Sequence, residues 1–245
     1  MILLSRNIVA SFLLIIFAAI FYLSAKANFN QMQVQTTATS SNQRPPKTYL
    51  ALGDSYTIGQ SVCEYDRYPV QTAKLLNDKG FHFCDPEIIA TTGWTTSDLQ
   101  KAITNYHFKD SIYDIVSLLI GVNNQYQGKS QSEYKDQFTL LLQNSIKLAG
   151  GKASHVIVIS IPDYSVTPFA NASNKKLISR QIDSFNMINK KVSDVYKVNY
   201  LCITDETRKA YADETLLAFD GLHYSGKEYG IWADKLAVQI IKILQ

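Results

Sequence analysis

Short apolar runs alternate with longer amphipathic stretches from residue 47 to the C-terminus. The runs over 113–121 (YDIVSLLIG) and 155–161 (HVIVISI) are almost continuously apolar, a pattern typical of strands that are covered on both faces. Shorter runs of the same kind predict three more strands, over 47–53, 87–90 and 199–204.

The stretches between these runs carry apolar residues at helical spacing. Between residues 175 and 196, apolar side chains recur at 178, 182, 185, 188, 192 and 195, which predicts an amphipathic helix. Thr95 and Asp98 fit a capping box at the start of a helix over 95–106. Three further helices are expected over 67–79, 130–149 and 226–244.

This alternation of strands and helices favours an α/β fold. The strands are expected to form a central parallel sheet of about five strands with helices on both faces, which makes a three-layer α/β/α sandwich. In such a sheet the loops at the carboxyl ends of the strands meet at one edge. Functional residues are therefore expected in the loops that follow the strands.

The N-terminus has the pattern of a targeting segment. Arg6 precedes an uncharged apolar run over 8–23, and Ala25-Lys26-Ala27 offers a small-residue cleavage site. The run is also close to the length of a membrane span, so residues 1–27 are either a signal peptide or a membrane anchor. Residues 28–46 are rich in polar residues and proline, which predicts a flexible linker. Either alternative places the domain over 47–245 outside the cytoplasm, as a periplasmic, secreted or membrane-tethered protein.

The charge of the chain limits the classes of partner that are expected, and its cysteine content leaves open whether a disulfide forms. The formal net charge is +3, and no Lys/Arg run lies beside clustered aromatic residues, so a nucleic-acid partner is not expected. In an oxidising compartment Cys63 and Cys84 could form a disulfide. The alternative is that these two and Cys202 are unpaired, partly buried thiols.

The first candidate motif is Gly53-Asp54-Ser55-Tyr56, directly after the first predicted strand. A strand-to-helix turn can expose a serine hydroxyl and aim it rigidly, which a nucleophile requires. Asp54 is next to Ser55, and adjacent side chains rarely reach one histidine together. We therefore expect Asp54 to brace the turn.

The second motif is Asp220-Gly221-Leu222-His223, shortly before the last predicted helix. An acid three residues before a histidine can accept a hydrogen bond from Nδ1 and leave Nε2 free to take a proton. His82, His107 and His155 have no such neighbour and are better explained as structural residues. None of the histidines shows metal-ligand spacing, so neither a metal nor an organic cofactor is expected.

Two more motifs also follow predicted strands. In Gly121-Val122-Asn123-Asn124, the side-chain amide of Asn123 could donate to a developing negative oxygen. In Thr91-Thr92-Gly93-Trp94, the lack of a Cβ at Gly93 would let a backbone N–H approach a substrate. Each of these motifs is, by itself, more often an ordinary turn or cap.

Together the four motifs, in the order Ser, Gly, Asn and Asp-x-x-His, resemble the SGNH hydrolases, the GDSL-type esterases and lipases. The resemblance extends from Thr48 to about Leu244, with Tyr56 and Asn124 where the family usually has leucine and aspartate. It implies a flavodoxin-like sheet and a serine esterase. Ser55, His223 and Asp220 would be the nucleophile, base and orienting acid. The oxyanion hole would consist of the Ser55 and Gly93 backbone N–H groups and the Asn123 amide.

The resemblance leaves the substrate open. A carboxylic ester of the acyl-lipid or O-acetylated-glycan class is expected, with a small or medium acyl group. Two alternatives use the same scaffold, an acyltransferase that works through the same acyl-enzyme and a ligand-binding module without activity. Aromatic residues in the loops after the strands either line a substrate pocket or pack under the loops; these are Tyr65, Tyr68, Trp94, Tyr126, Tyr164 and Phe169.

Overall fold

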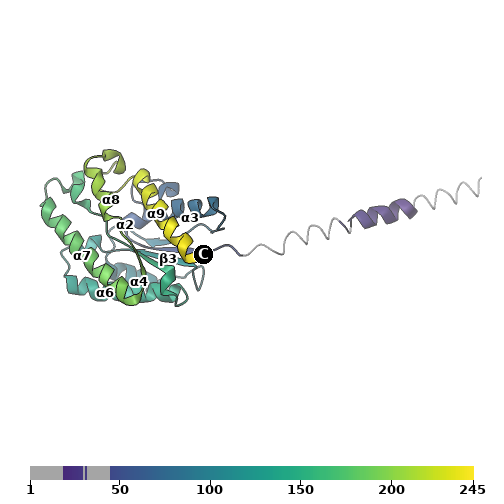
Figure 1. Cartoon of the computed structure of the whole chain (residues 1–245), viewed down its shortest axis with the longest axis horizontal. Helices are drawn as coiled ribbons and strands as arrows, with labels where there is room; N and C mark the ends of the chain where they lie inside the picture. The colour runs from purple at the N-terminus through teal and green to yellow at the C-terminus, as the bar shows by residue number, and fades with distance from the viewer. Residues whose placement is uncertain (1–18, 30, 32–44) are drawn as a thin grey trace, which may run out of the picture. The chain divides into compact units, whose positions relative to one another are not determined.

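The computed structural model describes residues 19–29, 31 and 45–245 (Figure 1). The chain divides into two compact units, Met1–Pro45 and Pro46–Gln245. Residues 19–29 are helical, but most of the predicted targeting run and linker lies outside the described residues. Across the described ranges, every helix is too short or too polar to cross a bilayer.

A five-stranded parallel sheet forms the centre of the larger unit, in the order β2-β1-β3-β4-β5. Its strands are β1 (Tyr49–Gly53), β2 (Glu87–Ala90), β3 (Ile115–Leu119), β4 (Val156–Ile159) and β5 (Asn199–Leu201). In register, Leu52 of β1 lies between Ile89 of β2 and Leu118 of β3. The predicted parallel sheet is confirmed. The chain adds β2 on one side of β1 and then β3 on the other side, so the strand order reverses at β1. Ligands of α/β sheets bind at such a switch point.

Helices cover both faces of the sheet (Figure 1). The helices α3 (Tyr68–Asp78) and α9 (Gly226–Leu244) pack against each other, and α6 (Gln131–Leu148) packs between α4 (Thr96–Asn105) and α7 (Lys175–Tyr196). Thr95 and Asp98 form the predicted capping box. Three one-turn helices follow strands and were not predicted; they are α2 (Ser55–Ile58), α5 (Val122–Tyr126) and α8 (Thr204–Thr207).

Four of the five predicted strands are longer in the sequence pattern than in the structure, and only β2 has the predicted bounds. The strands β3 and β4 end at Leu119 and Ile159, although Ile120 and Ile161 are also buried in the core. Beyond β4, the side chain of Asn186 on α7 replaces a neighbouring strand, because its Oδ1 accepts from the N–H of Ile161 at 2.7 Å. Burial therefore continues past the end of the strand, and an apolar run alone does not mark that end.

The three cysteines, Cys63, Cys84 and Cys202, are unpaired. The expectation that unpaired thiols would be partly buried is wrong, because all three residues are exposed. Cys63 lies in the loop before the 3₁₀ helix η1 (Glu64–Asp66), and Cys202 follows the last residue of β5. Both positions lie just outside regular elements, where a side chain can face solvent.

Candidate active site

Ser55 is the first residue of α2, directly after the central strand β1. Asp54 caps this helix, and its Oδ1 accepts from the N–H of Tyr56 at 3.1 Å. Gly53 allows the turn because a Cβ there would lie 2.1 Å from Oγ1 of Thr57 and 2.5 Å from the Leu119 carbonyl oxygen. The turn thus packs tightly against the neighbouring strand and holds Ser55 at the carboxyl edge of the sheet.

Asp54 is fully buried and braces this turn, as expected. Its Oδ2 has no hydrogen-bond partner in the described part of the chain. Burial raises the pKa of Asp54 to about 7, although the N–H of Tyr56 acts in the opposite direction. A carboxyl group with this pKa is largely neutral below pH 7, and within residues 45–245 it makes no hydrogen bond to His223.

Asp220 and His223 meet as their spacing predicted. The ring Nδ1 of His223 lies 2.6 Å from Oδ2 of Asp220, while Oδ1 accepts from the N–H groups of Leu222 and His223, both at 2.9 Å. This turn is closed by the N–H of Ala218, which donates to the His223 carbonyl at 2.8 Å. One carboxylate therefore fixes both the backbone of the turn and the orientation of the imidazole.

The charge of Asp220 is stabilised by its hydrogen bonds. Burial by itself raises the pKa of this carboxyl, but hydrogen bonds from the Ser61 hydroxyl, the His223 ring and two backbone N–H groups lower it to about 2. Asp220 is therefore ionised at any pH near neutrality. An ionised acceptor favours the imidazole tautomer with its hydrogen on Nδ1, which leaves Nε2 as a proton acceptor.

Asn123 lies on α5 after β3, and a hydrogen bond links it to the loop after β2. Its Nδ2 donates to the Trp94 carbonyl at 2.9 Å, so one of the two amide hydrogens is used and the other is left for a ligand. Gly93 in that loop has φ +85°, in the left-handed region that other residues seldom adopt. A glycine is thus favoured by the backbone conformation, although a Cβ at this position would meet no neighbouring atom within 4 Å.

Asn124 stands where the family pattern has aspartate, and it makes a well-defined buried contact. Its Oδ1 accepts from the N–H of Thr96 at 3.0 Å, and its Nδ2 donates to Oγ1 of Thr96 at 2.7 Å. An amide can both accept and donate, whereas an ionised carboxylate only accepts. The departure from the pattern therefore comes with a supporting contact to the start of α4.

A half-open cavity of about 140 Å³ joins these groups. It is lined by Ser55, Tyr56, Thr92, Gly93, Val122, Asn123, Tyr126, Tyr164, Phe169, Leu222 and His223. Four of the five predicted site residues line this cavity. The fifth, Asp220, does not line it but is hydrogen-bonded to His223, which does. Within residues 45–245 no hydrogen bond joins the Ser55 hydroxyl to the His223 ring. Such bonds are often long in unliganded sites and shorten only when substrate binds.

The six predicted pocket aromatics divide evenly. Tyr126, Tyr164 and Phe169 line the cavity, and their ring centroids lie 6.0 to 6.3 Å apart. The others do not line it: Tyr68 is buried against Trp232, Tyr65 is 70% exposed, and Trp94 packs on the core. Sequence reasoning did not single out Thr92, Val122 or Leu222, although each is next to a predicted site residue.

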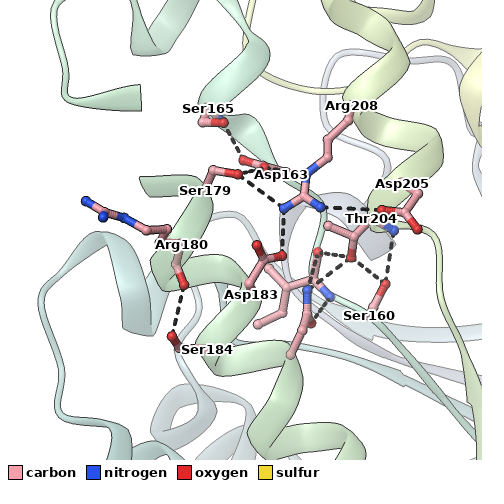
Figure 2. Close-up of polar contacts among 12 residues, drawn as sticks. Ser160, Asp163, Ser165, Ser179, Arg180, Asp183, Ser184, Thr204, Asp205 and Arg208 are labelled. Atoms are coloured by element: carbon pink, nitrogen blue, oxygen red, sulfur yellow. Dashed lines mark hydrogen bonds and ion pairs between the residues drawn. The ribbon is translucent and has the colours of Figure 1, made fainter. Parts of the chain in front are cut away.

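The cavity wall that carries Tyr164 is held by a buried polar network (Figure 2). Asp163 is fully buried; its Oδ2 accepts from Oγ of Ser179 at 2.6 Å and from Nε of Arg208 at 2.9 Å. Its carbonyl accepts from the Tyr224 hydroxyl at 3.0 Å, next to His223 in the chain. Burial raises the pKa of the Asp163 carboxyl, but the hydrogen bonds from Ser179, Ser165 and Arg208 to this carboxyl outweigh burial and lower its pKa. The network thus connects the β4 loop, α7 and the histidine turn.

Comparisons with known proteins agree with this architecture. The model of the GDSL-like lipase/acylhydrolase family matches residues 51–231. No curated protein sequence matches the chain. Among solved structures, a lipase/acylhydrolase from Enterococcus faecalis is 16% identical, with a TM-score of 0.61 over 79% of this chain and 95% of that one. TesA is 14% identical, with a TM-score of 0.62 over 80% and 99% of the two chains. Axe2, an acetylxylan esterase from Geobacillus stearothermophilus, is 18% identical, with a TM-score of 0.60 over 79% and 94%.

Proposed function

This chain belongs to the GDSL-like lipase/acylhydrolase family and is a hydrolase of ester bonds, and we propose that it works through an acyl-enzyme on Ser55. The observation that carries the proposal is the single cavity whose wall includes Ser55, Gly93, Asn123 and His223. The hydrogen bond of 2.6 Å between His223 and Asp220 supports the role of the histidine as base.

In the proposed first step, Oγ of Ser55 attacks the ester carbonyl carbon while Nε2 of His223 takes the hydroxyl proton. The new imidazolium is stabilised by the ionised Asp220. The tetrahedral oxyanion accepts hydrogen bonds from the backbone N–H groups of Ser55 and Gly93 and from the free amide hydrogen of Asn123.

Collapse of this intermediate releases the alcohol and regenerates the base. His223 gives its proton to the leaving oxygen, and the carbon–oxygen bond of the ester breaks to leave an acyl group on Ser55. A water molecule then gives a proton to His223, attacks the acyl carbon and releases the carboxylic acid. Ser55 recovers its proton in that last step, so the enzyme returns to its first state.

The size and lining of the cavity support a short acyl group. Its volume of about 140 Å³ is close to that of a cavity that holds one benzene molecule, roughly 150 Å³. No Asp, Glu, Lys or Arg lines it, which favours an uncharged substrate around the ester. Tyr126 and Phe169 are 60% and 48% exposed, and their aromatic rings can cover the apolar face of a sugar ring or a short chain. We favour short-chain esters of the O-acetylated-glycan or acyl-lipid class.

We further propose that the hydrolase acts outside the cytoplasm. The support is the sequence alone, in which Arg6, the uncharged run over 8–23 and the small residues around Lys26 match a signal peptide or an anchor. Cell fractionation of the full chain, with and without residues 1–27, tests this proposal. Full-length protein recovered with the cytoplasmic fraction would contradict it.

Turnover of p-nitrophenyl acetate, butyrate and octanoate by the full chain tests the function. We expect kcat/KM to be highest for acetate or butyrate and to fall for octanoate, and Ser55→Ala to lose at least about 10³-fold in kcat. Addition of an acceptor alcohol distinguishes transfer from hydrolysis, because a transferase would form a new ester. Equal rates for the wild type and Ser55→Ala would reject the assignment of Ser55.

A further inference from the structure

Ser61 lies in the loop between α2 and η1, and it contacts the predicted catalytic acid from 159 residues away in the chain. Its Oγ donates to Oδ2 of Asp220 at 2.6 Å. The same oxygen lies 2.6 Å from Nδ1 of His223. The serine hydroxyl and the imidazole therefore share one carboxylate oxygen, and Ser61 itself does not line the cavity.

The backbone of Ser61 is strained. Its φ is +68°, and among the described residues only His82 and Lys197 share a positive φ without being glycine. Lys197 ends the long helix α7, where a left-handed residue is common. The corresponding cap of α2 is Gly59, so Ser61 is not explained in that way. Strain of this kind persists where the surrounding structure imposes it, often at functional sites.

The contact completes the hydrogen bonding of the carboxylate. Backbone N–H groups hold Oδ1 of Asp220 from its own turn, while Oδ2 faces the imidazole. Within residues 45–245, the Ser61 hydroxyl is the only group outside this turn that hydrogen-bonds to the carboxylate, so it helps to fix the rotation of the carboxylate about its Cβ–Cγ bond. The Ser61 hydroxyl also takes part of the negative charge of Oδ2 through its hydrogen bond, so it tempers the attraction between that oxygen and a protonated imidazole.

We propose that Ser61 is a positioning residue of the hydrolase, which aims Oδ2 of Asp220 at His223 and touches no substrate. This inference rests on the proposed function, in which Asp220 orients the base. It also gives a reason for a serine at a position where glycine would remove the backbone strain.

Steady-state kinetics of Ser61→Ala with p-nitrophenyl acetate provides the first test. We expect kcat to fall about 10- to 100-fold, because a hydrogen bond to a charged group is lost, while KM changes less than about twofold. Ser184→Ala serves as the control, because that hydroxyl bonds only to the Arg180 carbonyl within α7. Wild-type kcat in Ser61→Ala would overturn the proposal.

A second measurement separates positioning from support of the fold. Ser61→Gly also lacks the hydroxyl but relieves the left-handed strain. It should therefore lose as much kcat as Ser61→Ala, but its unfolding temperature should be a few degrees higher than that of Ser61→Ala. If the two variants instead lost activity in proportion to their loss of thermal stability, the role of Ser61 would be structural only.

A double-mutant cycle tests whether Ser61 acts through Asp220. In an Asp220→Ala background, Ser61→Ala should cause no further loss of kcat, since the acceptor is already gone. An additive loss would overturn the inference.

Failure of this inference is distinct from failure of the proposed function: an active Ser55→Ala rejects the function, whereas a fully active Ser61→Ala beside an inactive Ser55→Ala rejects only the role of Ser61.

Discussion

The buried carboxyl group of Asp54 makes the stability of this hydrolase depend on pH in an unusual direction. Asp54 has no exposed surface, and burial raises its pKa from 3.8 to about 7. Between these two values the folded chain binds a proton at Asp54 that the unfolded chain has lost. The free energy of unfolding contributed by this group therefore falls as pH rises through that window.

The magnitude follows from the size of the pKa shift. A rise of about 3 units corresponds to roughly 4 kcal/mol, which is the cost of ionising Asp54 in the folded state above pH 7. Asp54→Asn removes this cost and keeps the cap of α2, because asparagine can accept from the N–H of Tyr56 as aspartate does. In the variant, the asparagine NH₂ group replaces Oδ2 of Asp54, which has no hydrogen-bond partner within residues 45–245. The free-energy cost of burying this NH₂ group without a partner does not depend on pH.

Urea unfolding of the wild type and Asp54→Asn, followed by tryptophan fluorescence from pH 4 to pH 9, measures this difference. We expect similar free energies of unfolding near pH 4 and a relative gain for the variant of up to about 4 kcal/mol at pH 9. Trp232 is fully buried and reports on the core. A difference that stays constant with pH, or that favours the wild type more at high pH, would refute the argument.

Three further predictions concern the site and its support. Asn123→Ala should fold normally and lose about 10²–10³-fold in kcat, as measured with p-nitrophenyl acetate, because one oxyanion donor is gone; an unchanged kcat would exclude that role. Asp220→Asn should lower kcat far more than Asp54→Asn, since only Asp220 bonds to His223, and the reverse order would contradict the assignment of the acid. Arg208→Met should lower the free energy of unfolding in urea by about 3 kcal/mol at pH 7, because Asp163 then keeps a buried charge without its cation. This last loss should diminish at acid pH as Asp163 is protonated, and a loss that is equal at all pH values would contradict its cause.

The fold was predictable because the pattern of the sequence and the packing agree. The strands β3 and β4 are buried on both faces, so their apolar runs stood out, and the capping box of Thr95 and Asp98 marked the start of α4. The ends of the strands were less visible, because Ile120 and Ile161 are buried just beyond them. One-turn helices such as α2 are too short to show a helical period.

The candidate site was predictable where its groups are close in sequence or follow a strand. Asp220 and His223 share a single turn, and Ser55 and Asn123 each lie just after a strand of the parallel sheet. Ser61 gave no such signal, since its contact with Asp220 depends on how two distant loops pack. Tyr68 was considered for the pocket because of its place in the chain, but its helix turns the ring toward Trp232.

Covalent labelling of Ser55 is the most direct test of the central claim, that the hydroxyl at the end of β1 is the nucleophile. The full chain would be incubated with a fluorophosphonate, digested, and examined by mass spectrometry while p-nitrophenyl acetate turnover is followed. The account predicts one adduct per chain on the peptide that contains Ser55, loss of activity in step with labelling, and no adduct in Ser55→Ala. An adduct on a different residue, or full turnover after Ser55 is completely labelled, would contradict it.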